Sequence, residues 1–313
     1  MKKIVRPIIV AMMLVGLVSQ QVYAIDTTAI NEKWGKPTVV YGGGLNDQQI
    51  KETSKLLGIK YENTVTTTKA TGEDLVKYLG AGEANTSVMI SSVMVQKRNK
   101  GEGVKVHIAT PKNITLVTSE QYANAAITAG VADAEIEVAA VSKVTGESAL
   151  TGVYKAFEAN GVVLDEKRTA VAQKELELTN QIVQEQSKEK GFDAAKLDQA
   201  MIDIKKALAE IKEKQGQVAT KEDVERIVNE ALKKYGLDTV ISPTQVNNII
   251  QFALSYQQTS AIDSKQVLEQ LNSLSNTVKG KIGQLVDQAN REGWLDKIVT
   301  FFKEIFNAIF SSK

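Results

Sequence analysis

Cysteine is absent from all 313 residues of this sequence. Its absence excludes disulfide bonds, thiolate nucleophiles, cysteine-ligated metals and lipid attachment through a cysteine. Histidine is almost as scarce, since His107 is the single example, so acid–base chemistry near neutral pH has few candidate groups. A zinc site would need carboxylates or water as its remaining ligands, and we therefore predict no metal and no cofactor.

One-sided charge and long apolar runs are also missing. The sequence has 38 basic and 37 acidic residues, a net charge of +1, and no clustered basic face. This balance lacks the electrostatic footprint of a nucleic-acid-binding protein, so no nucleic-acid partner is expected. After residue 24 no apolar run reaches the roughly 18 residues that a membrane-spanning helix needs.

The first 24 residues have the three-part pattern of a secretory signal peptide. Lys2, Lys3 and Arg6 form the positive start. The uncharged run that follows, from 8 to 18, is too short to cross a bilayer, which takes about 20 residues. Val22-Tyr23-Ala24 then resembles a cleavage site. We expect cleavage near Ala24 and a secreted, extracellular or cell-surface protein, and the lack of cysteine favours a Gram-positive envelope.

The composition of the chain changes near residue 162. Short segments rich in glycine, threonine and β-branched residues come before it, and helical spacing with many Gln, Lys, Glu, Ala and Leu residues follows. We predict an α+β fold, with an N-terminal mixed sheet and helices followed by a C-terminal helical bundle. The expected divisions are a signal peptide (1–24), an α/β domain (25–161), a helical domain (162–290) and an amphipathic C-terminal helix (291–313).

Residues 60–142 are predicted to follow the order β-α-β-β-α-β, which is that of the ferredoxin-like arrangement. Strands are expected over about 61–68, 87–97, 104–109 and 134–141, with helices over about 72–79 and 119–129. A glycine-containing turn at 99–103 separates the second and third strands. The third strand is therefore expected to return beside the second.

Gly42-Gly43-Gly44 lies between a predicted strand over 38–41 and a predicted helix capped by Asn46. Backbone N–H groups at such a place could hold a phosphate. The stretch lacks the Gly-Lys-Ser/Thr ending of a P-loop and the spacing of a dinucleotide-binding motif. A strand-to-helix turn is the simpler interpretation.

Two side chains, His107 and Ser148, are candidates for a nucleophilic site. His107 lies on the strand face opposite its aliphatic neighbours, where a solvated side chain is expected. Ser148 follows a strand and begins a helix, but a nucleophile elbow needs glycine where Leu150 stands. The Asp and Glu residues fall at helix-surface spacing, which predicts solvated faces. We assign no catalytic residue and lean away from an enzyme.

The second half is predicted to be helical. Helices are expected over about 147–160, 165–190, 193–214 and 220–235, and beginning near 243 and 263. The third helix carries an apolar seam with alternating spacings of 3 and 4, which must pack against another helix. The seam consists of Ala194, Leu197, Met201, Ile204, Leu208 and Ile211.

The C-terminal segment carries an unusually apolar face. Plotted at 100° per residue, eight large side chains fall within about 140°. They are Trp294, Leu295, Ile298, Phe301, Phe302, Ile305, Phe306 and Ile309. Burial of such side chains stabilises by about 1.5–3 kcal/mol each, so this face is a candidate partner or membrane surface. Because the charges of the segment balance, we favour self-docking or self-association over membrane contact.

Several stretches resemble a known family. Ser91-Ser92-Val93, residues 110–115, residues 122–125 and Ala129-Gly130-Val131 occur in this order, followed by a specific block at 144–158. Together they resemble the YpuA-like proteins, an uncharacterised family of exported Gram-positive proteins that is described as a domain of unknown function.

The resemblance covers about residues 36–290 and implies export and a cell-envelope setting. It supplies no catalytic residues. Members tend to have Gly-Ala-Asp-Leu-Thr after the first strand, where this chain has Gly43-Gly44-Leu45-Asn46. Any role of that acidic residue is therefore missing here.

We predict an exported, non-catalytic binding or structural protein of the cell envelope or extracellular space. Its expected partner is an envelope component or a second copy of the chain. One alternative is a cofactor-independent hydrolase or wall-active enzyme, which would need two carboxylates about 5–10 Å apart in a cleft. Another is a membrane-interface protein that uses the C-terminal helix.

Overall fold

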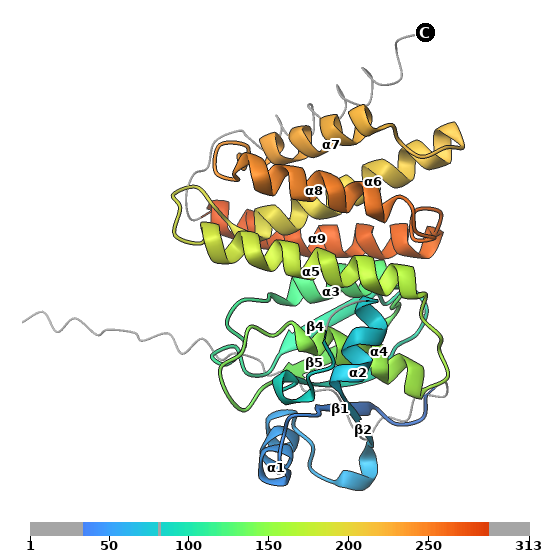
Figure 1. Cartoon of the computed structure of the whole chain (residues 1–313), viewed down its shortest axis with the longest axis vertical. Coiled ribbons are helices and arrows are strands. Elements are labelled where there is room, and N and C mark those ends of the chain that lie inside the picture. The colour runs from blue at the N-terminus through green and yellow to red at the C-terminus, as the bar shows by residue number, and fades with distance from the viewer. Residues whose placement is uncertain (1–33, 81–82, 288–313) are drawn as a thin grey trace, which may run out of the picture.

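A computed structural model describes residues 34–80 and 83–287 of the chain. It confirms the α+β fold, because a mixed sheet with helices comes first and a set of helices follows (Figure 1). The strands are β1 (Thr38–Gly42), β2 (Thr66–Ala70), β3 (Ser92–Lys97), β4 (Val104–Ile108) and β5 (Ala134–Ala139). Two short 3-10 turns are η1 (Glu62–Thr64) and η2 (Thr86–Val88). The helices are α1 (Asp47–Leu56), α2 (Gly72–Leu79), α3 (Ser119–Ala129), α4 (Ser148–Ala159), α5 (Glu166–Gln186), α6 (Ala194–Gln215), α7 (Lys221–Lys234), α8 (Pro243–Tyr256) and α9 (Lys265–Asp287).

The five strands lie in the order β2-β1-β3-β5-β4. β1 pairs parallel with β2, and β4 pairs parallel with β5, so each pair forms a parallel unit whose strands are joined through a helix. The two units meet through β3, which runs antiparallel to both β1 and β5. This arrangement accounts for the mixed sheet.

The order of elements over residues 60–142 is confirmed, but the ferredoxin-like arrangement and the predicted hairpin are wrong. β1 separates β2 from β3, and β5 lies between β3 and β4. Asp133 explains the second difference, because its carboxylate accepts the N–H groups of Gly101 and Gly103 at 3.0 Å each. The loop at 99–103 is thereby held against the start of β5 and does not form a tight turn between β3 and β4.

The strand predicted over 87–97 begins later, at Ser92. The preceding residues pack against the glycine turn that follows β1, where the Gly44 N–H donates to the Met89 carbonyl at 3.0 Å. A Cβ atom at Gly44 would come within 2.6 Å of the Ser87 carbonyl oxygen. The three glycines are therefore required by close backbone contact.

Capping residues and the spacing of apolar residues predicted most of the described helices correctly. The Asn46 side chain accepts the Gln49 N–H at 2.9 Å and begins α1, and Ser242 caps α8 in the same way. The predicted apolar seam of α6 is confirmed, since its five larger members are buried and α6 packs on α7 and α9.

One hydrophobic core extends through the sheet and the helical layers. Val40 of β1, Leu150 of α4, Leu176 of α5 and Ile282 of α9 belong to the same buried cluster. The opposite face of the sheet has a smaller cluster that includes Met94 and Leu57. The predicted boundary at 161/162 falls between α4 and α5, and the division into an α/β and a helical domain stays a prediction. The predicted signal peptide and the C-terminal helix over 291–313 lie outside the described residues.

Candidate functional site

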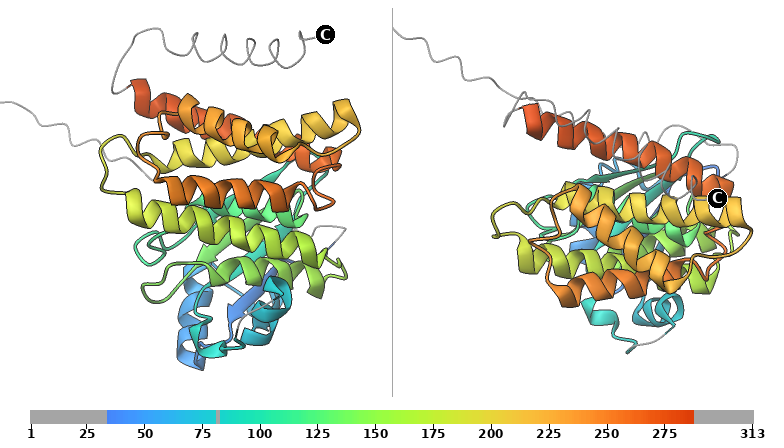
Figure 2. Two further views of the ribbon diagram at one scale, coloured as in Figure 1. Left: turned by 45° about the horizontal axis from the view of Figure 1, so that its top comes forward. Right: turned by 90° about the horizontal axis from the view of Figure 1, so that it is seen from above.

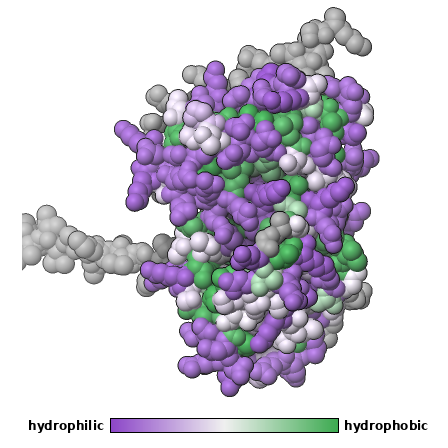
Figure 3. Space-filling view, viewed as in Figure 1, coloured by the Kyte–Doolittle hydropathy of each residue, from purple (hydrophilic) through white to green (hydrophobic). Residues whose placement is uncertain are grey.

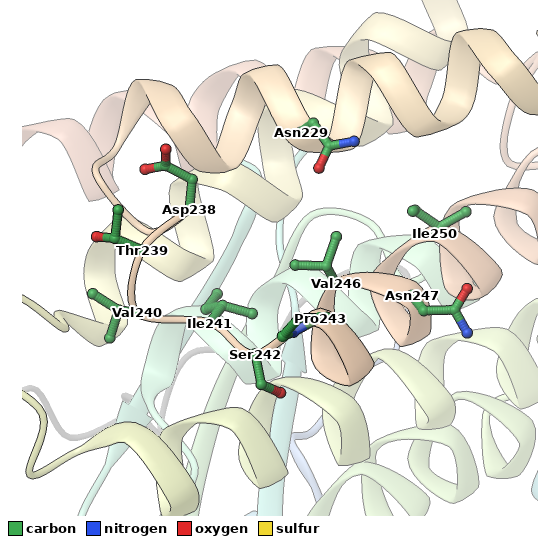
Figure 4. Close-up of a pocket in the computed structure, with 10 residues that line it drawn as sticks. All are labelled: Asn229, Asp238, Thr239, Val240, Ile241, Ser242, Pro243, Val246, Asn247 and Ile250. Carbon is green, nitrogen blue, oxygen red and sulfur yellow. The ribbon is translucent and has the colours of Figure 1, made fainter.

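A groove with a volume of about 510 Å³ lies between the end of α7 and the start of α8. The loop that joins these two helices forms one of its walls (Figure 4). α7 and α8 pack side by side, and Figure 1 shows both on the side of the sheet layer that is opposite to α1. The groove is lined by Asn229, Asp238, Thr239, Val240, Ile241, Ser242, Pro243, Val246, Asn247 and Ile250.

The groove has an aliphatic floor and a polar rim. Ile241 and Ile250 are buried, and Val246 and Ile250 point from α8 toward α7 in Figure 4. Asn229 points back toward them from α7, and its amide donates to the Glu225 carbonyl of its own helix at 2.8 Å. Asp238 is the charged member of the lining. Such a surface suits apolar side chains, with amides and a carboxylate at the margin to orient them.

Apolar side chains also reach the surface elsewhere on the helical layers, between hydrophilic ones, on the face drawn in Figure 3. The groove differs from such scattered residues because its aliphatic side chains are contiguous and come from a loop and a helix together. This groove was not predicted from the sequence. A signal was present, since Val240 and Ile241 are aliphatic residues in a short loop where polar residues are usual.

The predicted partner surface is Trp294, Leu295, Ile298, Phe301, Phe302, Ile305, Phe306 and Ile309, and it lies outside the described residues. The role of this surface stays a prediction. The described part of the chain contributes the groove as a second apolar surface.

His107 is paired with a buried carboxylate. Its Nδ1 atom lies 2.8 Å from Oε1 of Glu137, which stands opposite it on β5. The His107 side chain is 37% exposed and that of Glu137 is 3% exposed. The expectation of a simply solvated strand residue therefore needs correction. The parallel pairing of β4 with β5 could not be foreseen, and it brings the two side chains together.

The other two predicted candidates have structural roles. The N–H groups of Gly43 and Gly44 donate to the carbonyls of Ala70 and Met89 at 2.8 and 3.0 Å. They are therefore not aimed at a phosphate, and the simpler interpretation as a turn is confirmed. Ser148 is the first residue of α4, and Leu150 is fully buried below it.

The expectation that the acidic residues lie on solvated faces is wrong at several positions. Glu175 of α5 is buried beside the fully buried Lys205 of α6, with 2.7 Å between the carboxylate and the ammonium group. Lys205 also donates to Thr128 of α3 at 2.8 Å, and Thr128 donates to Glu175 at 2.7 Å. Burial, and next the charge of Glu175, raise the pKa values of the Tyr154 and Tyr256 hydroxyls.

This buried network joins α3, α5 and α6 where the helices of the sheet layer meet the helical layer. A second buried carboxylate, Asp203 of α6, accepts from the Tyr235 hydroxyl at 2.6 Å and from the Lys234 ammonium at 2.8 Å. Burial lowers the pKa of Lys234 to about 8, although Asp203 opposes the shift. Neither network borders the groove between α7 and α8.

Asp198 near the start of α6 is a buried acid with an incomplete set of partners. The Thr118 hydroxyl donates to its Oδ2 atom at 3.2 Å, and Oδ1 has no hydrogen-bond partner among the described residues. Burial raises the pKa of Asp198 well above its ordinary value, and the charge of Glu120 adds to the shift. The folded protein therefore holds a proton that the unfolded chain releases above about pH 4.

An Asp198→Asn variant is expected to be more stable than the natural chain at pH 7. Because the folded state binds the extra proton, the free energy of unfolding falls as pH rises from about 4 through the raised pKa of Asp198. The slope reaches at most about 1.4 kcal/mol per pH unit, and the variant lacks it. Urea unfolding between pH 4 and 8 measures the difference, which should close toward pH 4.

The exposed Asp263 provides the matched control, and Asp263→Asn should follow the natural chain at every pH. Equal or lower stability of Asp198→Asn at pH 7 would show that Asp198 is ionised and favourably bound in the folded state.

Within 34–80 and 83–287, no three His, Asp or Glu side chains gather in a way that could hold a metal ion. Over the same ranges no helix combines the length and the apolar character that membrane crossing requires.

Comparisons with known proteins agree with the resemblance in the sequence. Residues 41–274 match the family described as "Protein of unknown function (DUF1002)". The chain is also similar to the "Uncharacterized protein YpuA" of Bacillus subtilis (strain 168), with 29% identity over 286 residues. That similarity covers 88% of this chain and 89% of the relative. No solved structure matches the chain significantly.

Proposed function

The chain belongs to the DUF1002 family of proteins of unknown function, and we propose that it is an exported binding protein of the cell envelope or extracellular space. It acts by contact with an envelope component and not by catalysis. The observation that carries the proposal is the apolar face of the C-terminal segment, from Trp294 to Ile309, which needs a partner surface.

Export is supported by the first 24 residues. Their positive start, short apolar run and small-residue ending form a signal peptide pattern. The complete absence of cysteine fits a protein that folds outside the cytoplasm of a Gram-positive cell without disulfide bonds.

Binding is supported by the chemistry of the groove. Its floor is aliphatic, and Asp238 is the one carboxylate among its ten lining residues. A carboxylate-based hydrolase needs two such groups facing each other about 5–10 Å apart. The groove therefore provides contact area for a partner and lacks the acid–base pair of that alternative.

Cell fractionation tests the proposal. The full chain and a variant that ends at Gly293 are produced in a Gram-positive host, and intact masses are measured in the medium, envelope and cytosol. We expect the full chain in the envelope fraction with residues 1–24 removed. The shortened chain should be exported but released to the medium, because it lacks the apolar face.

Matched point variants test whether retention in the envelope depends on the apolar face or on the length of the chain. Phe301→Glu together with Phe302→Glu removes apolar surface, whereas Thr300→Glu together with Asn307→Glu adds the same charge to the opposite side. Only the first pair should be released. Retention of the leader in a cytosolic protein, or equal distribution of all variants, would refute the proposal.

A further inference from the structure

We infer that the groove between α7 and α8 is the docking site of this chain's own C-terminal segment, residues 294–309, when no partner is bound. The inference rests on the proposed function, because it names what covers the apolar face before the envelope component is met. It assigns a defined occupant to the contiguous aliphatic groove in the described part of the chain.

The position of α9, the last helix in the described part of the chain, favours this occupant. α9 ends at Asp287, and Lys281 near that end contacts Glu120 at the start of α3. The start of α6 lies there too, since Thr118, which caps α3, bonds Asp198. The groove is close by, because Val240 lies 3.8 Å from the Cβ position of Gly191, shortly before α6. Figures 1 and 2 show the α7–α8 loop and the last turn of α9 at the same end of the helical layers.

The length of the remaining chain also fits. Residues 288–293 separate α9 from Trp294 and can span about 20 Å when extended. As a helix, the stretch from 294 to 309 would be about 24 Å long. α8 has 14 residues and a length of about 21 Å, so the stretch can lie along it.

The two surfaces are chemically complementary. The groove offers Val240, Ile241, Val246 and Ile250, and the segment offers one Trp, four Ile or Leu and three Phe side chains on one face. A short linker holds the segment at an effective concentration in the millimolar range. A weak contact is therefore enough to keep the groove occupied, and a tighter partner can still displace the segment.

Disulfide formation tests the inference, and the natural absence of cysteine makes introduced pairs unambiguous. Asn247→Cys is placed on the rim of the groove and combined with Ile298→Cys or Ile305→Cys in the mature full-length chain. In the control, Lys51→Cys on the exposed surface of α1 replaces Asn247→Cys and is combined with Ile298→Cys or with Ile305→Cys. After mild oxidation at low protein concentration, intact mass and gel mobility separate bonds within one chain from bonds between chains.

We expect at least about tenfold more intrachain disulfide with Asn247→Cys than with Lys51→Cys, as a tethered contact predicts. A yield no higher than the control overturns the inference. A disulfide-linked dimer whose yield rises with protein concentration also overturns it, in favour of a second copy as the occupant.

Tryptophan fluorescence gives an independent measurement. Subtracting the spectrum of a Trp294→Phe variant isolates Trp294, because Trp34 is the other tryptophan. Its emission should be that of a buried indole in buffer and should shift to longer wavelength in Val246→Asp. Gln251→Glu adds the same charge at an exposed position of α8 that does not line the groove, and should leave the emission unchanged. Circular dichroism verifies that both variants are folded.

Solvent-exposed emission of Trp294 in the natural chain overturns the inference. The same holds if burial appears only on adding vesicles of phosphatidylglycerol and phosphatidylethanolamine, which would assign the segment to a membrane. These measurements use the isolated chain, whereas envelope retention is measured in cells. Failure of self-docking is thereby distinguishable from failure of the proposed function.

Discussion

A Lys205→Met variant is expected to lose about 3–5 kcal/mol of unfolding free energy. The substitution leaves the Glu175 carboxylate buried without the ammonium group that lies 2.7 Å away. It also removes a hydrogen-bond donor from Thr128 and from the Asn124 carbonyl. Because a domain is commonly stable by only about 5–15 kcal/mol, this loss is large enough to leave part of the protein unfolded. Urea unfolding followed by circular dichroism measures it.

A double variant distinguishes loss of the ion pair from loss of packing. Replacing Lys205 and Glu175 together by Met removes both buried charges and fills a similar volume, so most of the lost stability should return. Lys174→Met on the exposed side of α5 is the control and should stay within about 0.5 kcal/mol of the natural chain. If the double variant were as unstable as Lys205→Met, the network would have to act through shape and not through charge.

A Gly146→Ala variant should also be strongly destabilised, by about 2–5 kcal/mol. Gly146 has a φ angle of +107°, which is unfavourable for any residue with a Cβ atom. The new Cβ would lie 2.8 Å from a methyl group of Ile114 and would collide with the Tyr122 hydroxyl. That hydroxyl donates to the Gly146 carbonyl at 2.5 Å and holds the turn before α4. Both strain and overpacking therefore contribute.

Gly161→Ala isolates the contribution of the backbone. Gly161 also has a positive φ angle, +78°, but no atom of the described residues lies within 4 Å of its Cβ position. It should cost only about 1–2 kcal/mol. Adding Tyr122→Phe to Gly146→Ala should cost less than the sum of the two single changes, because the colliding hydroxyl is gone. Equal losses for Gly146→Ala and Gly161→Ala would show that the turn rearranges freely.

Features set by near neighbours in the sequence could be predicted. Asn46 and Ser242 cap their helices through hydrogen bonds to residues three positions later, so the sequence alone contains the signal. The seam of α6 is equally local, since its spacing defines one face of a helix. The α+β character of the chain follows from such segments taken in order.

Features set by distant residues could not be predicted. β5 lies between β3 and β4, and the loop at 99–103 is held by Asp133, which lies about thirty positions beyond it. The pairing of His107 with Glu137 follows from this position of β5. The hairpin predicted around the turn at 99–103 is wrong, because strand pairing is decided by contacts across the sheet and not by the turn residues alone.

Buried charges were missed for a related reason. Glu175 and Lys205 each have the spacing of a helix-surface residue, and the packing of α3, α5 and α6 against one another buries both. The groove was not predicted because it forms where a loop and parts of α7 and α8 pack together, and this packing is not encoded in any one local segment. The sequence could supply its aliphatic residues but not the hollow between them.

The hydrophobic core contains residues from both ends of the described chain, which limits how early during folding it can be completed. Its central cluster joins Val40, near the beginning, to Ile282, close to the end of the described chain. A polypeptide that emerges amino-terminus first cannot complete this interior until nearly all of it has appeared. The faces of α3 and α6 that pack against α9 must therefore remain uncovered until α9 has emerged, and contacts so far apart along the chain form slowly. A chaperone that covers these faces would be needed during that interval more than after it.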